Sequence, residues 1–334
     1  MRARKLVIGL AAATFSLATL AGQAIVIKFS HVVAVETPKG KAAAFFKQKA
    51  EELTHGKVRI EVYADSTLYK DKEELEALQL GAVQMIAPSL AKFGALGIRQ
   101  FELFDLPYIF NGYEELHKVT QGPIGRSLLD MLDSKGILGL AFWDNGFKVM
   151  SANTPLRRPE DFKGLKMRIQ PSSVLDAQMR ALGTLPRSMA FSEVYQALRG
   201  GVVDGTENPP SNLYTQKMHE VQEYVTLSDH GYLGYAVIVN KKFWEGLPSD
   251  IRQQLESAMD QATRYANQIA KAENESAMAE VEKSGKSEII TLTADEKKAW
   301  KKVLLKVHEQ MSDRIGKDLI QSVHKETGFD PAKF

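Results

Sequence analysis

Cysteine is absent from this chain of 334 residues. An exported protein without disulfides is held together by its core alone, and a zinc site without cysteine needs histidine and carboxylate ligands only. The length is sufficient for a sizeable core, in two domains or in one large domain. The composition is 44% hydrophobic and 25% charged, which is ordinary for a soluble globular protein.

Catalytic and cofactor motifs are missing as well. The chain has no phosphate-binding glycine loop of either standard spacing, no Gly-x-Ser-x-Gly and no His-Glu-x-x-His. The seven histidines are scattered without metal-ligand spacing, so the sequence predicts no metal site and no cofactor. The acid pairs Glu51-Glu52 and Glu73-Glu74 fall in predicted helices, where such pairs are usually solvated. We therefore expect a protein that binds a molecule and is not an enzyme.

The N-terminal segment differs from the rest of the chain. Residues 2–5 include three basic side chains, residues 6–21 are almost entirely apolar or small, and Gly22-Gln23-Ala24 has the small-x-small pattern of a cleavage site. This order is typical of a secretory signal peptide, which we expect over residues 1–24 with cleavage near Ala24. A membrane anchor is the alternative, but the apolar run is shorter than the roughly 20 residues that a span needs.

Net charge is close to zero. The whole chain has 43 basic and 41 acidic residues, and removing residues 1–24 takes away three basic residues and no acid. The mature chain would then have 40 basic and 41 acidic residues, a balance that does not indicate nucleic acid or anionic lipid as a partner. No later segment approaches a membrane span, so we expect a soluble product in the periplasm.

Strands and helices alternate along the mature chain. Strands are expected over residues 25–31, 58–62 and 83–87, with helices between them from Thr37-Pro38 and over 71–80, which indicates a parallel sheet with right-handed crossovers. The alternation repeats over 161–205, with a strand at 202–203 and a polar loop over 204–210. A helical pattern runs from Ser249 to about Ser284 and would be about 54 Å long. That length exceeds one domain, so we expect the helix to brace both.

Residues 164–173 indicate a strand that leads into a helix. Leu165, Met167 and Ile169 alternate with Lys166, Arg168 and Gln170, and Pro171 ends the strand. Ser172 or Ser173 can cap the helix that follows, which places Arg168 at the carboxyl end of a strand beside a helix N-terminus. A guanidinium and helix N–H groups both favour carboxylates. The stretch therefore predicts an anion site, and the alternative is a surface arginine paired with an acid.

Four more polar or aromatic residues fall at or just beyond predicted strand ends, namely His31, Trp143, Lys148 and Asn208. A dicarboxylate needs two separated cationic groups, and Arg168 and Lys148 could form part of that set. Each residue also has an ordinary alternative. Lys148 could be merely exposed, Asn208 could be a turn residue, and Trp143 could belong to the core.

Several motifs together resemble the solute-binding proteins of tripartite ATP-independent periplasmic (TRAP) transporters. They are Phe-Ser-His at 29–31, Leu-Pro-Tyr at 106–108, Asn-Gly-Phe-Lys at 145–148, Gly-Leu-Lys-Met-Arg at 164–168, the stretch 189–198, and Val-Asp-Gly-Thr-Glu-Asn-Pro at 203–209. The resemblance covers essentially the whole mature chain. It implies an α/β periplasmic binding protein fold with two domains, a hinge, a ligand cleft between the domains and a long helix spanning both. We expect domain I over 25–145 with 234–273, and domain II over 146–233 with 274–334.

The resemblance also implies roles for four residues. Arg168 matches the family arginine that pairs with a ligand carboxylate, and Asn208 matches an asparagine that contacts the same group. Phe191 matches a pocket aromatic. Lys148 stands where related sialic-acid receptors have a second arginine, so a basic residue is kept there with a different geometry.

Two positions depart from the sialic-acid receptors, because Val32 and Ser89 stand where those receptors have polar residues for the sugar. The stretch 68–75 and the loop 87–89 instead resemble the four-carbon dicarboxylate branch, whose usual ligands are succinate, fumarate and malate. The candidates for contact with the second carboxylate are Lys70, Ser89 and Lys92. Tyr235, at the start of a predicted strand over 235–239, is a further candidate ligand contact.

The resemblance thus implies a monomeric receptor that closes around a small dicarboxylate and delivers it to the small and large membrane subunits of a TRAP transporter. Two alternatives stay open. The same fold could bind a keto, aromatic or sugar acid, or it could serve as the ligand-sensing subunit of a membrane receptor.

Overall fold

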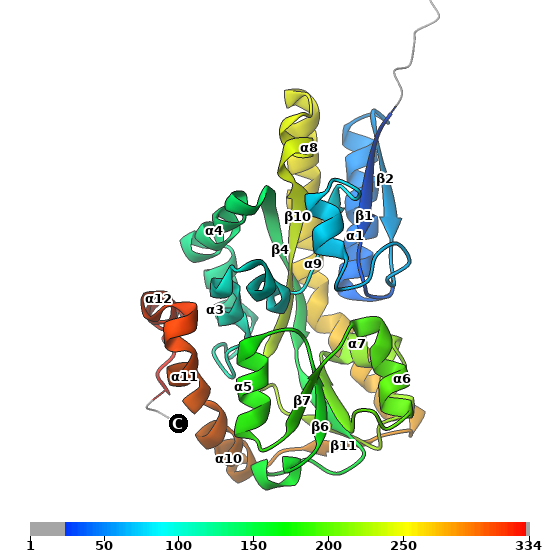
Figure 1. Cartoon of the computed structure of the whole chain (residues 1–334). Coiled ribbons are helices and arrows are strands. Elements are labelled where there is room, and N and C mark those ends of the chain that lie inside the picture. The colour runs from blue at the N-terminus through cyan, green and yellow to red at the C-terminus, as the bar shows by residue number, and fades with distance from the viewer. Residues whose placement is uncertain (1–23, 332–334) are drawn as a thin grey trace, which may run out of the picture.

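The computed structural model describes residues 24–331, so the predicted signal peptide lies outside the described residues except for Ala24. Within this range the chain forms two sheets with helices around them (Figure 1). The predicted α/β class is confirmed. None of the helices between residues 24 and 331 is long and apolar enough to cross a bilayer.

The first sheet has five strands in the order β2-β1-β3-β10-β4. Their bounds are β1 Ile25–Ser30, β2 Val58–Tyr63, β3 Met85–Ile86, β4 Ile137–Phe147 and β10 Tyr232–Asn240. The first three pair in parallel, as the sequence predicts, whereas β10 is antiparallel to both β3 and β4. Helix α1 (Pro38–Leu53) begins as expected, because the Thr37 side chain accepts from the Gly40 N–H and Pro38 follows it.

The second sheet has six strands in the order β11-β9-β5-β8-β6-β7. Their bounds are β5 Val149–Ala152, β6 Lys166–Ile169, β7 Leu185–Ser188, β8 Gly205–Asn208, β9 Tyr224–Leu227 and β11 Glu288–Thr291. One prediction is wrong here. The strand expected at 202–203 lies instead at β8, within the residues expected to form a polar loop. The reason is that the polar residues of β8 are buried, with partners from distant parts of the chain.

The chain passes directly from one sheet to the other in two places. Strand β4 continues through Lys148 into β5, and β9 continues through residues 228–231 into β10. The two passages lie side by side, since the Lys148 N–H donates to the Gly231 carbonyl at 2.9 Å. This pair of crossing segments is where a hinge between two domains would lie. The expected domain boundaries fall close to it and stay a prediction.

Helix α9 (Ser249–Ser284) has the bounds expected from the sequence. It packs on α1 and β4 of the first sheet and on α7 (Pro210–Thr215) beside the second, so it runs along both (Figure 1). Both helices contribute alanines to one buried cluster, including Ala258 and Ala262 on α9 and Ala43 and Ala50 on α1. Small residues at such a seam allow the two helices to approach closely.

The remaining helices cover the sheets and the crossing segments. They are α2 Glu74–Gln79, η1 Leu90–Leu96, η2 Arg99–Asp105, α3 Tyr113–Thr120, α4 Pro123–Asp130, η3 Met131–Lys135, η4 Pro159–Phe162, α5 Ser173–Ala181, η5 Phe191–Glu193, α6 Val194–Arg199, η6 Met218–Glu220, α8 Lys241–Glu245, α10 Ala294–Leu304, α11 Lys306–Ile315 and α12 Lys317–Thr327. Helix α12 packs on α3, and α11 on η2 and α5. The C-terminal helices therefore contact α3 and η2, which lie between β3 and β4 in the chain, and α5, which follows β6 of the second sheet.

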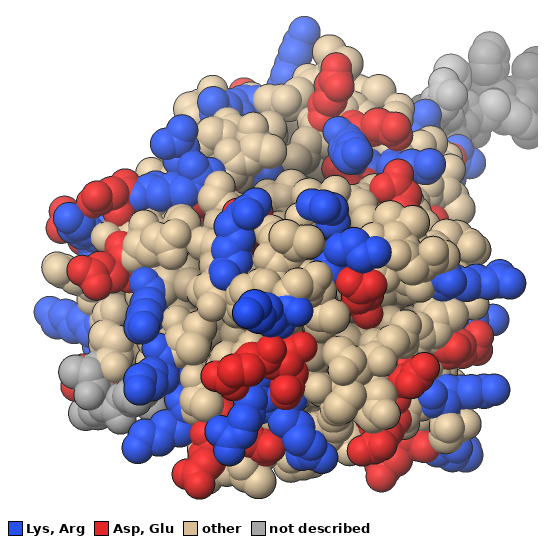
Figure 2. Space-filling model, turned by 60° about the horizontal axis from the view of Figure 1, so that its bottom comes forward, with Lys and Arg blue, Asp and Glu red and all other residues tan. Residues whose placement is uncertain are grey.

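Charges of both signs are interspersed on the face shown in Figure 2, where Lys and Arg side chains lie beside Asp and Glu. This face carries no extended block of one sign. Its pattern agrees with the near-neutral balance of charged residues in the sequence.

Candidate functional site

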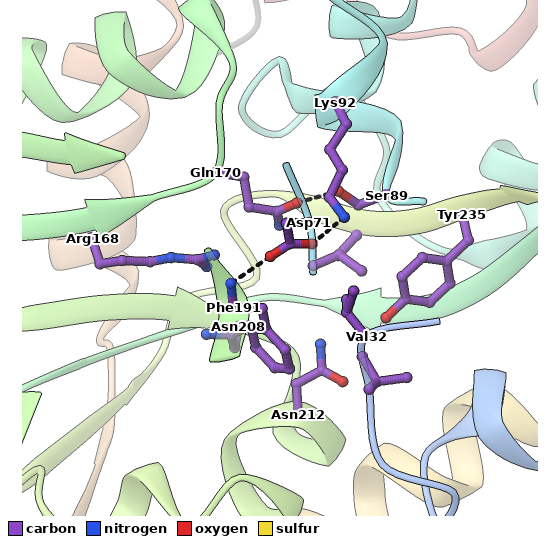
Figure 3. A pocket seen from close by; sticks show the side chains of 12 residues that line it. Val32, Asp71, Ser89, Lys92, Arg168, Gln170, Phe191, Asn208, Asn212 and Tyr235 are labelled. Carbon is purple, nitrogen blue, oxygen red and sulfur yellow. Dashed lines mark hydrogen bonds and ion pairs between the residues drawn. The ribbon is translucent and has the colours of Figure 1, made fainter. Parts of the chain in front are cut away.

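A small pocket lies between the two sheets, close to the carboxyl ends of β1, β3, β6 and β8. The side chains that line it are Val32, Val33, Asp71, Ser89, Lys92, Leu233 and Tyr235 from the first-sheet side, and Arg168, Gln170, Phe191, Asn208 and Asn212 from the second (Figure 3). The cavity is about 20 Å³, little more than the space of one water molecule. A larger ligand would therefore need the lining side chains or the two halves to move apart.

Arg168 lies on β6, near its carboxyl end. Helix α5 begins just after it, as the sequence predicts, because the Ser172 side chain caps this helix by accepting from the Leu175 N–H. The guanidinium is only 2% exposed, and its Nη2 donates to the Met189 carbonyl at 3.0 Å. Its Nε is buried without a hydrogen-bond partner, and among residues 24–331 no carboxylate lies within 4.0 Å of the guanidinium. Burial lowers the pKa of Arg168, but an arginine stays protonated in proteins. The site thus contains a buried positive charge with an unused donor.

Lys92 is the second cation of the pocket, and it is paired twice. Its Nζ contacts the Asp71 carboxylate, and it lies 2.7 Å from Glu74 Oε1. All three side chains are nearly or fully buried. Burial would lower the pKa of Lys92, but the two carboxylates outweigh that effect and raise it. Burial raises the pKa of Glu74, although Lys92 opposes this.

Polar contacts across the pocket join the two halves of the molecule. The Phe191 N–H donates to the Asp71 carboxylate, and the Ser89 hydroxyl donates to Gln170 Oε1. Asn145, at the end of β4, donates from Nδ2 to Asn212 Oδ1 at 3.0 Å and to the Tyr235 hydroxyl at 2.7 Å. The two halves are therefore in contact at three places around the cavity, as in the closed form of a binding protein.

Six of the ten residues that the sequence singles out line this pocket. They are Arg168, Asn208, Phe191, Ser89, Lys92 and Tyr235. Asn208 contributes a buried amide whose Oδ1 has no partner, and the Phe191 ring lies 5.8 Å from the Arg168 guanidinium carbon. The pocket that contains Arg168 therefore also has an unpaired amide oxygen and an aromatic ring in its lining. The ligand roles expected for the six residues stay predictions.

Lys148 and Trp143 lie outside the lining, because each has a partner elsewhere. Lys148 is 1% exposed, and its Nζ is 2.7 Å from Glu207 Oε1, while Glu207 Oε2 is 2.8 Å from His230 Nε2. Trp143 is fully buried in the core under α9, and its Nε1 donates to Thr263 Oγ1 at 3.0 Å. Both are therefore structural in this arrangement, and neither presents its polar group to the pocket.

His31 and Lys70 also lie outside the lining. The His31 ring is buried against Phe29, and burial together with Lys39 lowers the pKa of His31 to about 3. Its imidazole is therefore neutral and offers no charge to a ligand. Lys70 is exposed on the loop before α2. Its neighbour Asp71 is the residue of that loop that points into the pocket (Figure 3).

Sequence reasoning missed six of the lining residues as ligand-site candidates, namely Val32, Val33, Asp71, Gln170, Asn212 and Leu233. A signal existed for one of them, because Gln170 follows Arg168 by two positions and shares its strand face. Asp71 lies in a loop without periodicity, so no local pattern shows its direction. Asn212 lies on α7, and its place in the pocket depends on how that short helix packs on α9.

This geometry is that of a class of protein: a two-lobed binding protein with a buried arginine in the pocket between its lobes. The comparisons with known proteins agree. The chain matches the family described as bacterial extracellular solute-binding protein, family 7, over residues 29–314. It belongs to this family.

Close relatives come from several bacteria. The chain is 66% identical over 303 residues to the C4-dicarboxylate-binding periplasmic protein DctP of Rhodobacter capsulatus, covering 91% of each. Among solved structures, it is similar to a TRAP periplasmic solute-binding protein from Sulfurospirillum deleyianum with bound succinate, with a TM-score of 0.88, 45% identity and coverage of 90% of this chain and 99% of that one. It is also similar to a TRAP periplasmic solute-binding protein from Pseudomonas aeruginosa with bound L-malate. The TM-score is 0.84 and the identity 44%, with coverage of 86% of this chain and 99% of that one. The predicted family and the two-domain fold are thus confirmed.

Proposed function

We propose that this protein is the extracytoplasmic solute receptor of a TRAP transporter and that it binds a four-carbon dicarboxylate such as succinate, fumarate or malate. The observation that carries the proposal is the Arg168 guanidinium, which is buried at the pocket and has no carboxylate within 4.0 Å in the part of the chain that the structure describes. A buried charge without a partner is costly, and a ligand carboxylate removes that cost. The relatives named for C4-dicarboxylates or solved with succinate and malate support this choice of ligand.

Binding would begin in an open form, where Arg168 forks onto one carboxylate of the ligand. Closure then brings groups from the first-sheet side onto the rest of the molecule. The apolar side chains Val32, Phe191 and Leu233 are placed to contact the short carbon chain between the two carboxylates. A ligand shifts the open–closed equilibrium only by its differential affinity for the closed form.

We expect this protein to bind its ligand without a chemical step, because it belongs to a family of solute-binding proteins. The lining of the pocket includes the hydroxyl groups of Ser89 and Tyr235 but no histidine that could activate them. The receptor would act as a monomer in the periplasm and would present its closed form to the small and large membrane subunits. The extracytoplasmic location and the membrane partners are supported by the family to which the chain belongs.

A thermal-shift screen of the purified protein against organic acids tests the proposal. At about 1,000-fold excess over Kd, a true ligand stabilises the folded state by about 4 kcal/mol. We expect a large shift with succinate, fumarate or malate, and none with acetate or sialic acid. A shift with only a keto, aromatic or sugar acid would keep the fold and the role of Arg168 but would overturn the dicarboxylate assignment.

A further inference from the structure

Asp71 is a carboxylate inside a pocket that is built to receive carboxylates. It comes from the loop between β2 and α2, and its side chain points between the two halves (Figure 3). One carboxylate oxygen, Oδ1, accepts from the Lys92 ammonium of the first-sheet side. The other, Oδ2, accepts from the backbone N–H of Phe191 at the start of η5, on the second-sheet side. A single carboxylate therefore links the two halves across the cavity.

These are the contacts that a ligand carboxylate would make on closure: one oxygen on a cation, the other on a backbone N–H, with a guanidinium nearby. Burial alone would raise the pKa of Asp71, but Lys92, the Phe191 N–H and the more distant Arg168 outweigh it and lower the pKa to about 2. Asp71 is thus charged at neutral pH. Its negative charge lies where a dianionic ligand would also place one.

Glu74 is the second acid partner of Lys92, so it can be compared directly with Asp71. It pairs with the same lysine at 2.7 Å and carries the same formal charge. Unlike Asp71, it is fully buried and absent from the pocket lining, and among residues 24–331 it forms no hydrogen bond or ion pair with the second-sheet side. Lys92 therefore keeps an acid partner when Asp71 moves away. Asp71 is a partner that can be displaced, and Glu74 is one that stays.

We propose that Asp71 is a tethered stand-in for one ligand carboxylate, which holds the ligand-free receptor closed and must be displaced when the dicarboxylate binds. The inference rests on the proposed function. Its physical basis is competition, because Lys92 and the Phe191 N–H cannot be fully shared between Asp71 and a ligand in a cavity of about 20 Å³. Like charges held side by side in such a site repel each other strongly.

The first test compares Asp71→Asn with Glu74→Gln by isothermal titration calorimetry with succinate. Each variant removes one carboxylate from Lys92, but only Asp71→Asn removes a charge from the cavity. We expect Asp71→Asn to bind succinate about tenfold more tightly than wild type, and Glu74→Gln to stay within about threefold. Weaker or unchanged binding by Asp71→Asn overturns the proposal. An equal gain in both variants also overturns it, because the effect would then come from net charge alone.

The second test needs no ligand. Since the chain has no cysteine, Glu36→Cys and Glu220→Cys give two unique spin-label sites on exposed residues that line one surface cavity. We expect the distance distribution of the ligand-free protein to shift to longer values in Asp71→Asn, and Glu74→Gln to match wild type. An unchanged distribution in Asp71→Asn overturns the tether. If wild type binds no diacid at all, the proposed function and the displacement step both fail, whereas the distance measurement still tests the tether.

Discussion

The two cations of the pocket lie on opposite sides of it and differ in their partners. Arg168, on the second-sheet side, has an unpaired Nε and no carboxylate within 4.0 Å among the described residues. Lys92, on the first-sheet side, contacts both Asp71 and Glu74. The difference teaches that a buried charge is available to a ligand only when the chain has not already compensated it. We therefore expect the two sides of the pocket to contribute unequally to ligand binding, with the larger contribution from Arg168.

A third buried cation extends this comparison. Lys148 has one carboxylate, Glu207, at 2.7 Å, and both side chains are 1% exposed. Burial would raise the pKa of Glu207, but Lys148 and His230 outweigh it and lower the pKa to about 2. The Lys148–Glu207 pair thus stabilises the crossing segments between the sheets. The charge of Lys148 is thus paired within the chain, whereas we propose that the charge of Arg168 is available to a ligand.

The largest expected effect follows from Arg168→Ala. We expect succinate binding to weaken by about 3–5 kcal/mol, on the order of a thousandfold in Kd, because a desolvated ligand carboxylate loses its counter-charge. Calorimetric titration measures the change. Arg187→Ala is the matched control, since Arg187 is the exposed register partner of Arg168 on β7. Affinity of Arg168→Ala within tenfold of wild type would falsify the role of this residue.

Lys148→Met tests whether the buried Lys148–Glu207 pair contributes to stability and not to ligand binding. It leaves Glu207 buried without its lysine, so we expect the free energy of unfolding in urea to fall by about 3 kcal/mol. Succinate affinity of the folded variant should change by less than tenfold, because Lys148 does not line the pocket. The control is Lys166→Met, which breaks a half-exposed pair with Asp204 at 3.7 Å and should cost less than about 1 kcal/mol. A large loss of affinity with little loss of stability would show that Lys148 acts on the ligand.

Lys39 is a buried cation that forms no ion pair among the described residues, and its lowered pKa predicts how stability depends on pH. Its Nζ donates to the Ala87 carbonyl and lies 3.7 Å from the Tyr235 ring centroid. Burial lowers the pKa of Lys39 to about 7 from an ordinary value of 10.5, with Glu74 and Asp71 opposing the shift and Lys92 adding to it. Between these pH values the unfolded chain binds the extra proton, so the stability of the folded state rises with pH.

The slope from one such group approaches about 1.4 kcal/mol per pH unit. We expect Lys39→Met to reduce the gain in stability between pH 7 and 9, measured by urea unfolding at pH 7, 8 and 9. Below about pH 7 the lysine holds its proton in both states and contributes no slope. Lys41→Met, on the more exposed face of α1, is the control and should keep the wild-type slope. An identical slope in Lys39→Met and wild type would contradict the assignment.

Local patterns predicted part of this molecule well. The strand of Arg168, its Ser172 cap and the bounds of α9 depend on alternation, capping and helical periodicity, all of which are short-range signals. Strand β8 did not follow from its sequence, because Gly-Thr-Glu-Asn has no apolar alternation. It can form a buried strand because the Glu207 carboxylate pairs with Lys148 and His230, which lie 59 and 23 residues away in the sequence.

The pocket itself was only partly predictable for the same reason. Lys148 was expected to be either a ligand contact or an exposed residue, and neither expectation included Glu207, the buried acid that pairs with it. On the loop before α2 the sequence favoured Lys70, whereas the neighbouring Asp71 is the one that enters the cavity. In a loop without periodicity, a shift of one residue reverses which side chain points inward. The direction is decided by Lys92 and Phe191, and neither is a neighbour in sequence.

The smallest expected effect comes from Tyr235→Phe, which tests the first-sheet side without touching a charge. The Tyr235 hydroxyl accepts from Asn145 Nδ2, which keeps Asn212 Oδ1 as a second acceptor. Because Asn145 stays partnered, the loss should be about 1 kcal/mol, or about fivefold in the Kd for succinate. Tyr63→Phe, whose hydroxyl contacts Glu61 on β2 outside the pocket, should leave the Kd unchanged. A loss in Tyr235→Phe as large as that of Arg168→Ala would mean that the first-sheet side contributes as much as the second, and the inequality between the two sides would have to be abandoned.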